Sequence, residues 1–182
     1  MGSERSPSLC RPTLPVPRDL CDQCRMCCRF TDPDRSPWVS RTGDLTDFPE
    51  SFSAARPLRL LPLPEAPADP PVWRCSALGS DGLGCDIWGE HPADCRLYPL
   101  LVVFREGSFR MVLDPDCPFS SRESPSFFRR HADGFLSEEW VRMTPEGLRA
   151  IRPFAEREDR PHFQEVLVLP HPVAPRRGSA LP

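Results

Sequence analysis

The chain has 182 residues, 25 of them proline, and a net charge of −3 with acidic and basic side chains scattered along its length. This length suits one domain with tails, and the scattered charge excludes the basic stripe by which many proteins bind nucleic acid. The start lacks an apolar signal segment and no apolar run is long enough for a transmembrane helix, so we expect a cytoplasmic protein with reduced thiols and no membrane partner.

Composition divides the chain into four predicted segments. Residues 1–17 are rich in Ser, Pro and Arg, and we expect them to be disordered. Residues 18–122 carry most of the cysteines and form the predicted cysteine-cluster metal-binding domain. The pattern becomes helical over 123–169, the predicted C-terminal extension, and 170–182 is a predicted disordered tail.

The first cysteine group occupies residues 21–28 with the spacing C-x-x-C-x-x-C-C. On an α-helix these four thiols would fall within an arc of roughly 120°, because successive residues turn by about 100°. In a loop, each C-x-x-C would instead chelate through a tight turn. Both geometries suit metal binding, and we expect a cysteine-bearing helix here.

The segment that follows is irregular. Thr42-Gly43-Asp44 predicts a short helix capped by Asp44. Residues 56–71 contain six prolines, so we expect an extended connector with one short strand among its leucines. Residues 80–84, Ser-Asp-Gly-Leu-Gly, predict a turn between two further cysteines, Cys75 and Cys85.

A β-hairpin is predicted next. Apolar runs at 97–104 and 109–113 flank Glu106-Gly107-Ser108, which is a turn sequence. This hairpin would bring Cys117 back toward Cys95.

The remaining elements are predicted helices. Ser124-Pro125 is typical of an N-cap followed by proline at the first helical position. A second short helix is expected from Ser137, and a third from Thr144-Pro145 to near Pro153. We therefore predict a small, irregular, metal-stabilised α+β domain with a cysteine-bearing helix, a β-hairpin and short C-terminal helices.

Eight of the nine cysteines are candidate metal ligands: Cys21, Cys24, Cys27, Cys28, Cys75, Cys85, Cys95 and Cys117. Tetrahedral thiolate coordination suits zinc and iron–sulfur clusters alike. Cys27 and Cys28 are adjacent and diverge on a helix, so we expect them to serve different metals or a polynuclear cluster. Ordinary buried cysteines and a disulfide framework are the alternatives, and the odd cysteine count argues against the second. Cys10 lies apart from the others.

Three further residue types accompany the cysteines. Arg96 directly follows a candidate ligand, and its charge can offset that of the thiolates. Trp73, Trp88 and Tyr98 are expected to shield the site from water.

These motifs resemble a known family. The run at 21–28, Cys75-Ser-Ala-Leu78, Cys85-Asp-Ile-Trp88, the segment 92–99 and Cys117 are similar to the YkgJ-type cysteine-cluster family, the CxxCxxCC zinc- or iron-chelating domain. The resemblance covers residues 18 to 120 and implies eight cysteine ligands, zinc or iron, and a small cytosolic bacterial protein.

The resemblance has two departures and one further implication. The family often has glycine before the paired cysteines, where this chain has Arg25-Met26, and Arg-Pro where this chain has His91-Pro92. His91 is thus a substitute polar contact or a ligand. Some relatives are linked to lysine N-methylation of flagellin, with an iron–sulfur cluster implicated.

Three functional hypotheses follow. The leading one is a metal-binding protein that chelates zinc or iron, with an iron–sulfur cluster as one form, through its eight cysteines. The second is an iron–sulfur oxidoreductase or a protein- or peptide-modifying enzyme related to flagellin lysine N-methylases. The third is a zinc-stabilised protein-interaction module. Metal ions are the expected partners in all three, with a protein or peptide partner in the last two, and no catalytic residue is assigned.

Overall fold

The computed structural model describes residues 16–24, 26–30, 58–63, 72–79, 84–88 and 91–171. Four α-helices and two small antiparallel sheets make up this part of the chain, so the predicted α+β class is confirmed. Within it, no helix combines the length and apolarity needed to cross a membrane. The short helix predicted from Asp44 lies outside the described residues.

The first cysteine group forms two short helical pieces. Helix α1 (Arg18–Cys24) carries Cys21 and Cys24, and the 3₁₀ turn η1 (Met26–Cys28) carries the adjacent pair. A 3₁₀ turn rotates by about 120° per residue, so the second pair points in directions that differ from those of a continuous α-helix.

The first sheet is very short. Strands β1 (Arg29–Phe30), β3 (Trp73–Cys75) and β2 (Leu60–Pro62) pair antiparallel in the order β1-β3-β2. β2 is the strand predicted among the leucines of the proline-rich connector. After β3, Leu78 and Cys85 form an isolated antiparallel bridge that places these two residues side by side.

The second sheet contains the predicted hairpin, β4 (Leu100–Arg105) and β5 (Ser108–Leu113). Its two-residue turn has positive φ at Glu106 (52°) and Gly107 (78°), the geometry that matches the natural twist of paired strands. The hairpin is confirmed, but its first strand begins later than predicted because Leu97 ends helix α3 (Ala93–Leu97).

A third strand that the sequence analysis missed completes this sheet. β6 (Gln164–Val168) pairs with β5, so the order is β4-β5-β6. The segment after residue 122 thus shares a sheet with the segment before it.

The C-terminal helices begin where predicted. Helix α4 (Pro125–Glu138) is capped by Ser124, whose Oγ accepts from the Phe127 N–H at 3.3 Å. Helix α5 (Pro145–Glu158) is capped by Thr144, whose Oγ1 accepts from the Gly147 N–H at 3.0 Å.

Two predicted helix boundaries are wrong. No separate helix begins at Ser137, because α4 runs on to Glu138 and only a 3₁₀ turn, η4 (Trp140–Arg142), follows. α5 does not end near Pro153 but passes through it, because Ile151 and Ala155 on either side are buried and their packing carries the helix on.

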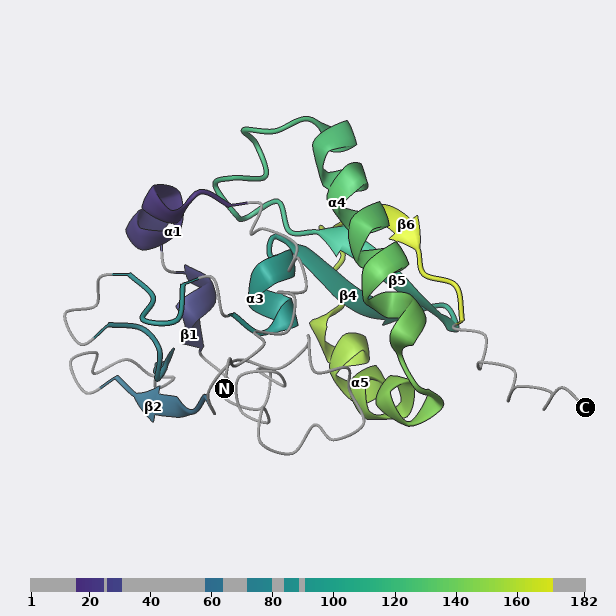
Figure 1. Cartoon of the computed structure of the whole chain (residues 1–182), viewed down its shortest axis with the longest axis horizontal. Helices are drawn as coiled ribbons and strands as arrows, with labels where there is room; N and C mark the ends of the chain where they lie inside the picture. Colours follow the sequence, from purple (N-terminus) through teal and green to yellow (C-terminus); the bar gives the residue numbers. More distant parts are fainter. Residues whose placement is uncertain are drawn as a thin grey trace, which may run out of the picture.

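Burial is unequal between the two sheets. In Figure 1, α1, β1 and β2 lie on the left, and β4, β5 and β6 with α4 and α5 lie on the right, with α3 between them. The large core belongs to the right-hand part and includes Phe128, Phe135 and Trp140, each at most 2% exposed. Val16 and Leu20 also belong to it, which anchors α1 to the larger region.

Candidate metal centre

All eight candidate cysteines line a single cavity of about 60 Å³. A single water needs about 10–15 Å³ of such space, so the cavity has room for several atoms. The thiols come from α1, η1, β3, the Leu78–Cys85 bridge, α3 and the segment after β5. The structure therefore brings together residues that are as far apart in the sequence as Cys21 and Cys117.

None of the eight cysteines is joined in a disulfide. Cys75 and Cys117 are buried, and the other six are half-buried. The disulfide alternative has no support in the described residues.

Cys27 lies at the centre of the first cysteine group. Hydrogen bonds with Cys21 and Cys28 raise the pKa of Cys27 well above its ordinary value, and its burial adds to that effect. The same two hydrogen bonds lower the pKa of Cys21 and the pKa of Cys28. Cys27 thus contacts both Cys21 and Cys28 and holds its proton more strongly than either of them.

The thiols of Cys85 and Cys117 also resist ionisation. Burial raises the pKa of Cys85 to about 11, and the nearby thiols Cys28 and Cys75 raise it further. Burial likewise raises the pKa of Cys117, to which Cys24 contributes. These groups are therefore protonated thiols in the metal-free chain. A bound cation would reverse this, because a coordinating thiol is deprotonated outright.

The positive charge of Arg96 is paired with a carboxylate. Its guanidinium forms a two-bond pair with Glu139, with Nη1 2.8 Å from Oε1 and Nη2 3.1 Å from Oε2. The expected charge compensation of the thiolates is therefore already shared with a carboxylate.

His91 lines the same cavity and is 5% exposed. Burial, with a contribution from Arg96, lowers the pKa of His91 to about 4, so its imidazole is neutral at pH 7. The neutral imidazole is the form that binds metals. Its ring meets that of Trp88 edge to face, with the centroids 5.1 Å apart.

Two of the three aromatic residues expected to shield the site do line the cavity, Trp88 and Tyr98. The Tyr98 hydroxyl donates to Asp114 Oδ2 at 3.0 Å, and burial raises the pKa of Tyr98. Trp73 is half-buried in β3 and is not among the residues that line the cavity.

A second group of ligand atoms lies on the surface. Among the described residues, Asp114, Asp116 and His162 bring three donor atoms within 4.8 Å of one another, and the last two are exposed. The sequence does not indicate this group, because His162 reaches the two aspartates only through the fold. No three of the eight cysteine sulfurs approach one another this closely within the part of the chain that the structure describes.

No family model matches the chain, and neither a curated protein nor a solved structure matches it. The resemblance to the YkgJ-type family therefore rests on the motifs quoted above.

Proposed function

We propose that this protein binds a polynuclear metal centre, an iron–sulfur cluster in the first place and a zinc cluster in the second, through its eight clustered cysteines. The observation that carries the proposal is the convergence of all eight thiols, from separate elements, on one cavity. Soft thiolate ligands select zinc and iron–sulfur clusters, so the donor set fits both groups.

Binding of a cation in this cavity would require the cysteine thiols to lose their protons. Burial and neighbouring thiols raise the pKa of Cys85 and, with hydrogen bonds, that of Cys27. Any metal must displace these protons, so the apparent metal affinity of the site should rise with pH.

The spacing of the sulfurs supports more than one metal atom. In a tetrahedral zinc site with Zn–S bonds of about 2.3 Å, the sulfurs lie about 3.8 Å apart. Within the described residues no three sulfurs are all within 4.8 Å of one another. A polynuclear centre would divide the thiolates among more than one metal atom, so they would not all need to lie this close together.

When bound, an iron–sulfur cluster would supply electron transfer. The chain's own residues would hold it, exclude water through Trp88 and Tyr98, and present a neutral imidazole at His91. The enzyme and interaction-module hypotheses stay predictions beside this one.

Anaerobic purification followed by an absorbance spectrum and assays of iron, zinc and sulfide tests the proposal. An iron–sulfur centre gives a brown protein that dithionite bleaches, and a zinc cluster gives a colourless protein with about two zinc ions per chain if each takes four thiolates. The C27S/C28S variant should lose the metal, and Cys10→Ser, which changes the one cysteine outside the group, should keep it. A wild-type protein with neither metal after supply of both would contradict the proposal.

A further inference from the structure

A buried ion pair connects the wall of the cysteine cavity to the C-terminal helices. The side chains of Arg96 and Glu139 are each 4% exposed, and they meet through two parallel hydrogen bonds of 2.8 and 3.1 Å. This fork geometry fixes orientation as well as distance. The two residues are 43 positions apart in the chain.

The Arg96 end of the pair belongs to the metal centre. Arg96 follows Cys95 in α3, and its Nε donates to the backbone carbonyl of His91 at 3.1 Å. One guanidinium therefore holds both ends of the segment 91–96, which contributes two residues to the cavity wall, His91 and Cys95.

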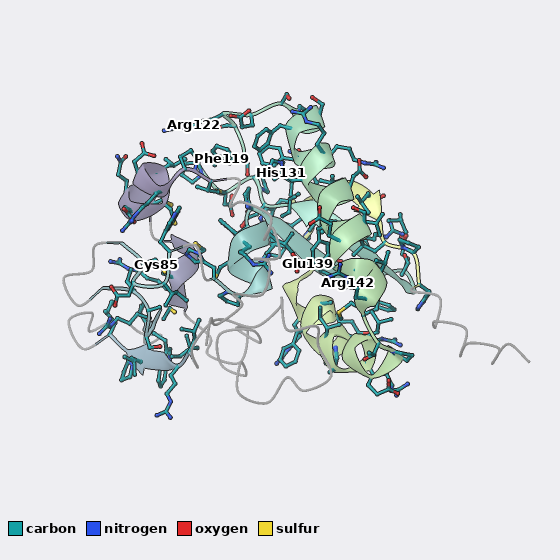
Figure 2. All side chains as sticks on the ribbon, in the orientation of Figure 1. Cys85, Phe119, Arg122, His131, Glu139 and Arg142 are labelled. Carbon is teal, nitrogen blue, oxygen red and sulfur yellow. The ribbon has the colours of Figure 1, made fainter. Side chains whose placement is uncertain are left out.

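The Glu139 end belongs to the large core. Glu139 is the C-cap of α4, and its N–H donates to the Phe135 carbonyl at 2.9 Å. Its neighbour Trp140 is fully buried. In Figure 2 Glu139 is labelled beside the C-terminal helices, whereas Cys85 is labelled in the opposite part of the molecule.

We propose that Arg96, held by Glu139, is a positioning residue of the metal centre: it fixes Cys95 and His91 in the cavity wall and so couples metal binding to the packing of α4 and η4. This inference rests on the proposed metal binding. A buried ion pair often contributes no more stability than apolar residues of similar size would. Its two-bond geometry and its third bond to His91 point to orientation as its role.

The test measures how fast the metal-loaded full chain releases Zn²⁺ to a chromogenic chelator under reducing conditions. Zn²⁺ suits thiolate sites whichever metal the protein carries. We expect Glu139→Gln and the double variant R96M/E139M to release Zn²⁺ at least tenfold faster than the wild-type chain. The double variant replaces the pair by apolar side chains, so it keeps the fold where the single variant leaves a buried charge unmatched.

Asp159→Asn is the matched control. It weakens another Arg–carboxylate pair, in which Arg105 Nε lies 2.9 Å from Asp159 Oδ2, between the end of β4 and the end of α5. Neither residue lines the cavity, so the release rate should match that of wild type. A folded R96M/E139M variant with the wild-type release rate would overturn the proposal.

Thiol alkylation of the metal-free chain separates this inference from metal binding itself. Peptide mapping should show Cys95 alkylated several-fold faster in Glu139→Gln than in wild type, with Cys117 unchanged because it is buried in the large core. If the wild-type chain takes up no metal, the proposed function fails and the alkylation result still stands. Equal Cys95 rates in the two chains would refute the positioning role.

Discussion

The two regions of this molecule differ in the lengths of their helices and strands and in the size of their cores. The cysteine region, with α1, η1 and the sheet β1-β3-β2, has strands of two or three residues and its own core of four buried residues: Leu58, Cys75, Ala77 and Ile87. The C-terminal region has strands of five or six residues, two helices of 14 residues, and a core rich in aromatic side chains.

We therefore expect the two regions to be stabilised in different ways. Burial of large apolar side chains contributes about 1.5–3 kcal/mol each, which supports the C-terminal region without help. The core of the cysteine region has too few such side chains. Structural zinc contributes about 10–16 kcal/mol in small zinc domains, which compares with the whole net stability of about 5–15 kcal/mol of an ordinary protein.

Metal removal is therefore the largest perturbation we expect. A chelator under reducing conditions should unfold the cysteine region and leave the C-terminal region folded. Amide hydrogen exchange checks this: protection should be lost over 73–78 and 85–88 and kept over 109–113 and 128–138. α1 should respond less than β3, because Leu20 packs into the large core. Unchanged protection in both regions would show that the cysteine region needs no metal.

Trp140→Ala should destabilise the C-terminal region. Trp140 is fully buried, meets the ring of Phe109 at 5.3 Å between centroids, and donates from Nε1 to the Pro170 carbonyl at 2.8 Å. Truncation of such a residue costs about 3–5 kcal/mol, measured by denaturant unfolding.

The neighbouring Val141→Ala is the control for this change. Val141 is 52% exposed, so its truncation should alter the free energy of unfolding by at most about 0.5 kcal/mol. Equal effects of the two substitutions would show that the aromatic core is not what stabilises this region.

The free energy of unfolding should depend on pH through His91. Its pKa is about 4 in the folded chain against an ordinary 6.5, because its burial disfavours the charged ring. Between these values the unfolded chain binds the extra proton, so the stability contributed above pH 6.5 is lost as the pH falls toward 4.

The lost contribution is at most about 3 kcal/mol, from the size of the pKa shift. Comparison of the unfolding free energies of wild type and His91→Gln at pH 8 and pH 5 isolates this effect, since the thiols titrate in both chains. The difference between the two chains should shrink at pH 5. A constant difference would mean that His91 does not stay neutral in the folded protein.

The elements that the sequence predicted well are those set by local chemistry. Glu106-Gly107 determines a tight hairpin turn through its backbone conformation alone, and Ser124 and Thr144 cap their helices through side chains only three residues away from their partners. The cysteine spacing likewise selected eight residues that all line the cavity.

The elements that were missed depend on distant partners. β6 forms because Leu167 pairs with Met111 in β5, and no local sequence pattern predicts this pairing. The Arg96–Glu139 pair could not be predicted from the sequence either, since both residues are of types that usually lie on the surface. α5 continues past Pro153 because its packing against β4 outweighs the local penalty of proline.

The smallest effect we expect on the free energy of unfolding is that of losing a helix cap in the C-terminal region. Thr144 Oγ1 accepts from the Gly147 N–H at the start of α5, and Thr144→Ala should cost about 1 kcal/mol in denaturant unfolding. Ser137→Ala removes an exposed hydroxyl near the end of α4, where alanine is a good helix former, and should cost nothing measurable. Metal content should be unchanged in both variants, because α5 contributes no residue to the cavity. A metal loss in Thr144→Ala would mean that the stability of α5 is coupled to metal binding, and the separation of the two stabilities would have to be abandoned.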